Sequence, residues 1–107
     1  MPLSSREQLP DASVAQVLGI LGEYSSAHPG ARIKAYRQNS ASIRVRIIDC
    51  DFHGQDRVDR ERAIWGILEA LPAVVQNEIT LLLLLTPEEA DSSFANFEFE
   101  NPLPSQL

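Results

Sequence analysis

The chain is poor in the residues on which most metal and redox proteins depend. Its 107 residues include one cysteine, Cys50, and only two histidines. One thiol cannot form an internal disulfide, and it cannot complete a four-ligand metal cage alone. We therefore interpret Cys50 as a small side chain near the end of a strand, and we expect no resident cofactor.

Long apolar runs and glycine-rich phosphate loops are also missing. The run from Ile79 to Leu85 has the length of a strand, far short of the ~20 residues that span a bilayer. The N-terminus lacks the basic start and apolar stretch of a secretory signal. Gly19, Gly22 and Gly30 do not have the spacing of a phosphate loop. These absences predict a cytoplasmic protein without membrane contact.

The charge of the chain is acidic but unevenly placed. The net charge of −6 argues against non-specific binding to nucleic acid. Residues 29–70 hold eight basic and six acidic side chains, for a charge of +2. Residues 71–107 hold six acids and no base, for −6. We therefore expect a mildly basic middle and an acidic C-terminal part.

The sequence contains no nucleophile–base set of the kind that catalysis requires, so we predict that the chain is not an enzyme. Cys50 and His53 lie three residues apart, with Asp49 before Cys50 and Asp51 after it. A thiolate and an imidazole suit zinc or iron–sulfur chemistry. Two ligands on a loop are a weak metal candidate, which would need further ligands from a partner chain.

Alternating stretches at residues 31–37 and 42–48 flank the polar turn Gln38-Asn39-Ser40. A period of two residues is typical of half-buried strands, so the two stretches predict a β-hairpin. The apolar run at 79–85 predicts a strand that is covered on both faces. The hairpin should present four cations on one face and bury the other face, which consists of Ile33, Ala35, Ile43, Val45 and Ile47.

Two stretches have the period of an amphipathic helix. The first follows Asp11 or Ser13 as the capping residue, with apolar side chains at Val14, Val17, Leu18 and Leu21. The second begins at the N-cap Asp56 and should bury a stripe made of Val58, Trp65, Leu68 and Leu71. Arg57, Arg60 and Arg62 are predicted to lie away from the centre of that stripe. Pro72 ends this helix or begins a short further turn.

The C-terminal part combines aromatic rings with acids. Its phenylalanines are Phe94, Phe97 and Phe99, and residues 96–100 alternate like a strand. We expect this segment to lie on the outer face of the sheet or at its edge, where its rings would shield Leu82 and Leu84. Its acids would then meet the cations of the hairpin. A homodimer formed through the same sheet face is the alternative.

Residues 47–89 carry a spaced pattern. A strand end is followed by Phe52, by Gly54 two residues on, and by Arg60-Glu61-Arg62, which leads into the second helix. The last strand ends in Thr86-Pro87-Glu88-Glu89. This pattern resembles the BolA family, in which an Arg-His-Arg triplet precedes the helix and a Thr-Pro-Glu-Glu signature follows the last strand.

The resemblance implies a fold that agrees with the periodicities. It is an α+β fold in the order α-β-β-α-α-β, similar to a type II KH domain, with a three-stranded mixed sheet and helices on one face. We divide the chain into a flexible N-terminal arm at 1–10, a BolA-like domain at 11–90 and an acidic, aromatic extension at 91–107, which packs on the sheet.

The sequence departs from the family at the ligand positions. BolA proteins partner monothiol glutaredoxins and share an iron–sulfur cluster through histidine. Glu78 stands where that histidine would begin the last strand, Glu61 replaces the histidine of the triplet, and the hairpin turn has neither Cys nor His. A carboxylate is a hard oxygen ligand and replaces imidazole poorly on iron, so we do not expect standard cluster sharing.

The leading hypothesis is a non-enzymatic adaptor or regulator that binds another protein, a glutaredoxin-like one if the resemblance extends so far. The expected contact residues are Phe52, Gly54, Arg57, Arg60 and Arg62. The alternative is a nucleic-acid-binding domain, in which these arginines contact phosphates. Acids in the same turn, and the lack of a Gly-x-x-Gly clamp, make nucleic acid the less favoured partner.

Overall fold

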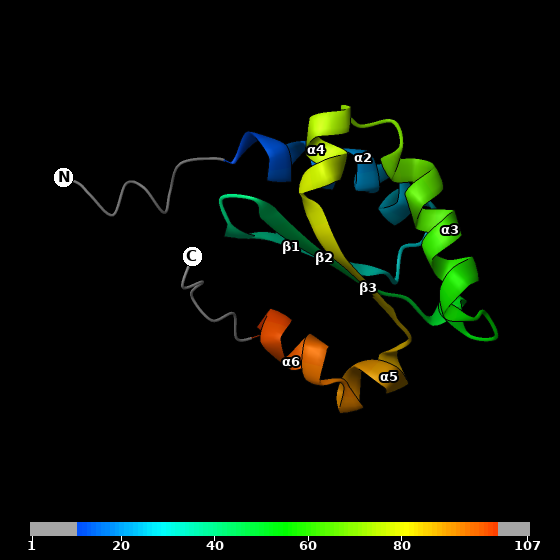
Figure 1. Cartoon of the computed structure of the whole chain (residues 1–107). Coiled ribbons are helices and arrows are strands. Elements are labelled where there is room, and N and C mark those ends of the chain that lie inside the picture. Colours follow the sequence, from blue (N-terminus) through cyan, green and yellow to red (C-terminus); the bar gives the residue numbers. More distant parts are fainter. Residues whose placement is uncertain (1–10, 101–107) are drawn as a thin grey trace.

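The computed structural model describes residues 11–100, apart from the side chain of Glu98. Its elements follow the predicted order α-β-β-α-α-β, with two further helices after the last strand (Figure 1). They are α2 (Ala12–Ala27), β1 (Arg32–Asn39), β2 (Ser42–Ile48), the 3-10 turn η1 (Cys50–Phe52), α3 (Arg57–Leu68), α4 (Ala73–Glu78), β3 (Ile79–Leu85), α5 (Pro87–Ser92) and α6 (Phe94–Glu100). The predicted arm at 1–10 and the last residues of the predicted extension, 101–107, lie outside the described residues.

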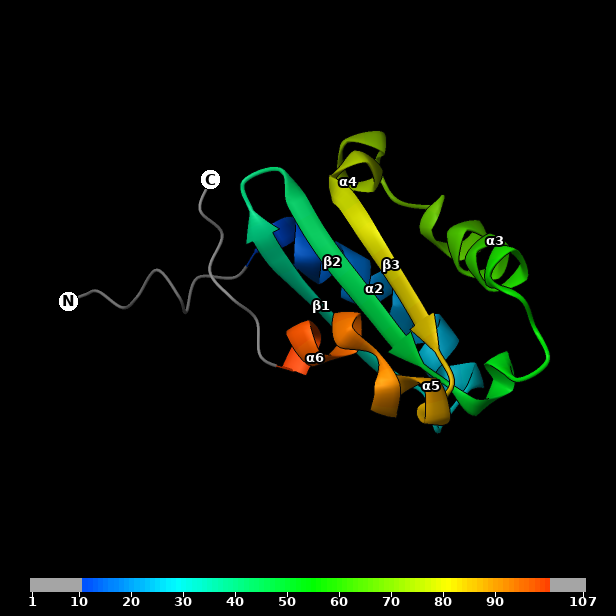
Figure 2. The ribbon, with the colours of Figure 1, turned by 60° about the horizontal axis from the view of Figure 1, so that its bottom comes forward.

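The three strands form one mixed sheet in the order β1-β2-β3 (Figure 2). β1 and β2 pair antiparallel as the predicted hairpin, and β2 and β3 pair in parallel. A parallel pair needs a crossover connection, which α3 and α4 provide. The predicted α+β class and the mixed three-stranded sheet are therefore confirmed.

The core lies between the sheet and the helices α2, α3 and α4, which cover one face (Figure 1). Ile43, Val45 and Ile47 are fully buried there, as the alternation predicts. Ile33 and Ala35 of β1 are only half-buried at the edge of this core. The difference follows from position, because β1 is an outer strand and β2 is the middle strand.

Of the two predicted caps of helix α2, Asp11 and Ser13, the structure uses Asp11, whose carboxylate accepts a hydrogen bond from Val14 N at 3.0 Å. Its buried side chains are Val17, Leu21 and Tyr24. Leu18, which was expected to be inside, is exposed. Val17, Leu21 and Tyr24 lie on one side of the helix, and the Tyr24 ring adds to the apolar area of that side. The helix therefore turns this side toward the sheet, and a stripe centred on Leu18 would bury less apolar area.

The buried side of α3 differs from the predicted stripe. Asp56 caps the helix by accepting from Asp59 N at 2.9 Å, as expected. The fully or largely buried side chains are Arg60, Ile64 and Leu68, and Val58 is exposed. The prediction that Arg60 lies away from the buried stripe is wrong, because a guanidinium can enter a protein interior where acceptors surround it.

The faces of β3 are also the reverse of the prediction. Val45 is paired with Leu82, and Ile47 with Leu84. Side chains of paired residues share a face, so Leu82 and Leu84 lie on the helix side, where both join the core. The outer face of the strand carries Leu81, Leu83 and Leu85.

The C-terminal segment forms helices where a strand was predicted at 96–100. A five-residue alternation also fits a short helix, and the capping box of Thr86 and Glu89 directs the chain into α5. α6 lies on the outer face of the sheet (Figure 2). Of the three phenylalanines that were expected to cover this face, Phe99 alone is buried. Phe99 is fully buried, whereas Phe94 and Phe97 are 90% and 65% exposed.

Polar contacts hold α6 to the cations of the hairpin, as expected. Arg46 binds the Glu100 carboxylate, and its guanidinium carbon lies 5.6 Å from the centre of the Phe99 ring. Tyr36 meets the same ring edge-on, with ring centres 5.2 Å apart. Arg46 also holds the pKa of Glu100 below its ordinary value. Among the described residues, no helix is long and apolar enough to cross a membrane.

Candidate functional site

A groove of about 670 Å³ follows the outer edge of β3. Its floor is Leu81 to Leu85, which supply both the backbone and apolar side chains. The wall on the α3 side includes Asp56, Arg57 and Glu61, and the opposite wall comes from the residues 92–95 that join α5 to α6. The groove therefore lies where the helix start predicted from the sequence meets the last strand.

The backbone of β3 has unpaired groups along this groove. In the described chain, β3 has a strand neighbour on one side only, which is β2. Asp49 N donates to Leu85 O at 2.9 Å, so the carbonyl of Leu85 points toward β2. In a strand, the N–H and C=O of one residue point to the same edge, and those of the next residue point to the opposite edge. Because the C=O of Leu85 points toward β2, the N–H and C=O groups of Leu82 and Leu84 point away from β2 and into the groove. The edge offers a template for a further strand.

Arg60 closes one end of this edge. Its Nη1 donates to Leu84 O at 3.0 Å and to Glu89 Oε1 at 2.6 Å, and its Nε donates to Gln55 O at 3.0 Å. The residue is 9% exposed, and its guanidinium carbon lies 5.5 Å from the centre of the Phe52 ring. Arg60 thus joins the loop before α3 to β3 and α5, and it occupies the carbonyl of Leu84 while leaving the backbone of Leu82 open to the groove.

Glu89 receives charge-stabilising bonds from two directions. Arg60 and the backbone N–H of Thr86, at 2.9 Å, lower its pKa from 4.5 to about 2. The carboxylate is therefore ionised at neutral pH, and the Arg60–Glu89 pair persists. The helix start at Thr86 supplies this acid, and no pattern in the sequence assigns the acid to Arg60.

The predicted contact residues divide between the interior and the surface. Phe52 is buried beneath the loop, and Gly54 has a φ of 80°, a conformation that favours glycine. Arg57 is 85% exposed in its side chain, lines the groove and pairs with Glu61 at 2.9 Å. Arg62 pairs with Asp59 at 3.5 Å. Phe52, Gly54 and Arg60 therefore shape the site, and Arg57 is available at its rim.

Within residues 11–100, Cys50 and His53 do not belong to a converging group of three potential metal ligands. Cys50 is exposed, and His53 Nε2 lies 3.1 Å from Glu88 Oε1. Among the described residues, the one group whose ligand atoms converge consists of His28, Asp49 and Asp51. The role of Cys50 and His53 in metal binding stays a prediction.

Glu78, which the resemblance aligns with a ligand histidine of the BolA family, takes part in an ion-pair network. Arg37 Nη2 lies 3.4 Å from Glu78 Oε1, and Arg37 Nε binds the Asp11 carboxylate. The Arg37 guanidinium holds the pKa of Asp11 below its ordinary value. Hard carboxylates already bound to a guanidinium do not fit an iron–sulfur cluster.

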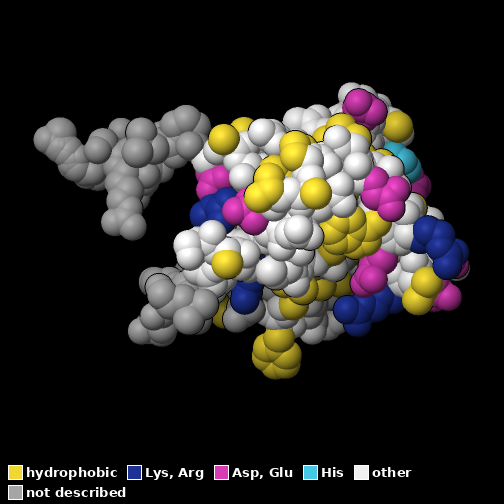
Figure 3. All heavy atoms as spheres, turned by 45° about the horizontal axis from the view of Figure 1, so that its top comes forward, with side chains coloured by type: hydrophobic (Ala, Val, Ile, Leu, Met, Phe, Trp, Pro, Cys, Tyr) yellow, Lys and Arg dark blue, Asp and Glu magenta, His cyan; other side chains and the backbone are white. Residues whose placement is uncertain are grey.

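The face shown in Figure 3 carries basic and acidic side chains next to one another, with apolar side chains between them. No broad area of this face is basic alone. A surface of this kind lacks the continuous positive stripe that typifies nucleic-acid-binding proteins.

The fold and the groove define a small α+β protein whose architecture is BolA-like. The chain is similar to BolA1 from Arabidopsis thaliana, with 16% identity and a TM-score of 0.52 over 76% of this chain and 98% of that one. A Bol-like protein from Babesia bovis matches with 19% identity and a TM-score of 0.50, over 74% and 90% of the two chains. The BolA domain of SufE1 from Arabidopsis thaliana matches with 17% identity and a TM-score of 0.50, over 76% and 99%. No family model and no curated protein matches the sequence. These likenesses show the fold, and the function must be argued from the site.

Proposed function

We propose that the protein is a non-enzymatic adaptor that binds a partner protein through the groove at the edge of β3. The partner contributes an extended, apolar segment, which adds to the sheet as a fourth strand. Main-chain hydrogen bonds supply affinity in this mode of recognition, and pockets for alternate side chains supply specificity. The observation that carries the proposal is the unpaired backbone of Leu82, which faces a groove with a leucine floor.

The charges at the groove support a protein partner over nucleic acid. Arg57, Arg60 and Arg62 are each paired with an acid of the same region. A phosphate backbone would have to break these pairs and would meet the carboxylates directly, which opposes binding. The mixed charges of the rim suit the polar border of a protein interface instead.

The resemblance to BolA proteins suggests a monothiol glutaredoxin as the first partner to test. Binding should not depend on an iron–sulfur cluster, because the ion pairs of Glu78 and Arg37 stand where the ligands would be. Titration calorimetry with the apo and the cluster-loaded glutaredoxin tests both points. We expect equal affinities for the two forms. A complex that forms only with the cluster would contradict the proposal.

A pair of substitutions tests the location of the contact. Leu81→Glu places a charge on the groove floor, on the outer side of β3, and we expect it to weaken binding at least tenfold. Val74→Glu is the matched control, because Val74 is an exposed apolar residue of α4 outside the groove. Equal effects of the two substitutions would exclude the groove. A salt titration with DNA and RNA checks the alternative, since phosphate contacts strengthen at low salt.

A further inference from the structure

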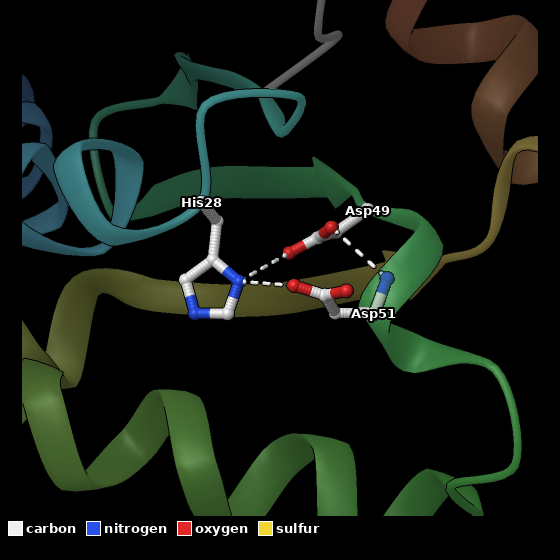
Figure 4. A group of neighbouring side chains, drawn as sticks. All are labelled: His28, Asp49 and Asp51. Atoms are coloured by element: carbon white, nitrogen blue, oxygen red, sulfur yellow. Dashed lines mark hydrogen bonds and ion pairs between the residues drawn. The ribbon is translucent and has the colours of Figure 1, made fainter.

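Three side chains from two distant parts of the sequence, His28 and the pair Asp49 and Asp51, converge on the helix side of the sheet (Figure 4). His28 ends α2, and Asp49 and Asp51 lie in the turn that follows β2. His28 Nδ1 lies 2.7 Å from Asp51 Oδ2 and 3.1 Å from Asp49 Oδ2. This cluster is separate from the groove, none of whose lining residues belongs to it.

The side chains of the cluster are held in place by their neighbours. The Tyr24 ring stacks on the His28 ring, with centres 4.0 Å apart and planes 8° apart. Tyr24 OH donates to Asp49 Oδ2 at 2.5 Å, and Asp51 N donates to Asp49 Oδ1 at 3.1 Å. Burial raises the pKa of Tyr24, so its hydroxyl remains a donor. Hydrogen bonds of this kind orient the ligands of metal sites.

The cluster places two carboxylates against one imidazole. Within residues 11–100, the ion pairs of Asp49 and Asp51 are both made with His28. Asp49 is only 2% exposed, whereas the side chain of Asp51 is 60% exposed. Buried charges are costly unless they are paired. A divalent cation between the two carboxylates and a neutral imidazole would balance both charges.

We propose that His28 Nδ1, Asp49 Oδ2 and Asp51 Oδ2 bind a divalent cation of the zinc class. Tetrahedral ligands about 2.1 Å from zinc lie about 3.4 Å apart, so the ligand atoms, which lie 2.7 and 3.1 Å apart in the cluster, would separate by less than about 1 Å to hold the ion. The imidazole favours zinc over magnesium and calcium, which prefer oxygen ligands alone. Water completes the coordination on the side of Asp51, whose side chain is 60% exposed.

This site goes beyond the adaptor function, and neither proposal requires the other. A bound cation would join the C-terminal end of α2 to the turn that precedes α3. It would stabilise the folded chain by mass action, because the unfolded chain does not hold the three ligands together. Zinc affinity should fall as the pH decreases, because protons compete for the imidazole.

Titration of the full chain with zinc chloride tests the site. Calorimetry should give one zinc per chain, and a hundredfold excess over the dissociation constant should raise the melting temperature by roughly 10 °C. The imidazole 15N spectrum should show a shift at Nδ1 of His28. Asp51→Asn should weaken binding at least tenfold, and its exposed position leaves the fold intact.

His53→Asn is the matched control, because His53 is the other histidine of the chain and also pairs with a carboxylate. It should bind zinc as the wild type does. The proposal is overturned if the wild type binds no zinc at millimolar concentration. It is also overturned if His53→Asn abolishes binding while Asp51→Asn leaves it unchanged, since the metal would then be held by the loop around Cys50.

Discussion

Arg60 is a buried cation that connects three parts of the molecule. It contacts the loop before α3, the carbonyl of Leu84 in β3 and the carboxylate of Glu89 in α5. In most amphipathic helices an arginine marks the solvent side, so helical periodicity alone could not place it inside. Arg60 pairs with Glu89, an acid that follows Thr86 and is distant in the sequence. Only the fold brings these two side chains together, so no local pattern reveals that Arg60 is buried.

Arg60→Met tests the importance of these contacts while retaining most of the side-chain volume. The substitution leaves the carbonyl of Leu84 without its donor, and we expect the free energy of unfolding to fall by about 2–4 kcal/mol. Arg57→Met, which removes an exposed pair, should cost about 0.5 kcal/mol or less. Urea denaturation measures both, and equal losses would show that Arg60 has no structural role.

The pKa of Glu89 predicts how stability depends on pH. The folded pKa of about 2 lies below the ordinary 4.5, so the contribution of Glu89 is complete above about pH 4.5 and disappears as the pH falls toward 2. Comparison of the wild type with Glu89→Gln by chemical denaturation between pH 6 and pH 2 isolates this contribution. The wild type should be the more stable protein at pH 6, and the difference should close toward pH 2. A constant difference across the range would contradict the assigned pair.

The helix α6 covers the basic face of the sheet with one ring and one carboxylate. Phe99 is fully buried against Tyr36 and Arg46, so its truncation should leave a cavity. We expect Phe99→Ala to lower the free energy of unfolding by about 3–5 kcal/mol. Phe94→Ala, at an exposed position on the same helix, is the control and should have an effect within about 0.5 kcal/mol.

The same pair of variants addresses the homodimer alternative. A cover within one chain predicts that wild type and Phe99→Ala have the same molar mass by light scattering at low concentration. A dimer formed through this face predicts that Phe99→Ala changes the molar mass. Phe99 is buried within a single chain, which favours a cover formed by the chain's own α6. The homodimer stays a prediction, and the molar mass from light scattering would support or exclude it.

The elements differ in how far the sequence determines them. The hairpin, the cap at Asp56 and a cap at one of Asp11 or Ser13 were predicted correctly, because each depends on neighbours within a few residues. The faces of β3 were assigned wrongly, because a run that is apolar on both sides contains no alternation. Its register with β2, a long-range property, decides which leucines face the helices.

At the scale of the whole molecule, the functional features arise from residues that are distant in the sequence. The groove combines the start of α3, the edge of β3 and the end of α5, and the cluster of His28 combines α2 with the turn after β2. Two of the predicted contact residues, Arg57 and Arg60, line the groove, so the predicted contact region and the groove overlap. It could not show that Arg60 and Phe52 are interior, or that the backbone of β3 provides the open edge.

The whole-molecule account depends on the outer edge of β3 accepting a strand from a partner. Amide hydrogen exchange, measured by NMR on the free protein and on its complex with a glutaredoxin, tests this directly. The amides of Leu81 and Leu83 face β2 and should exchange slowly in both states, whereas the amide of Leu82 should exchange rapidly in the free protein and slowly in the complex. A complex in which the exchange of Leu82 is unchanged would contradict the account.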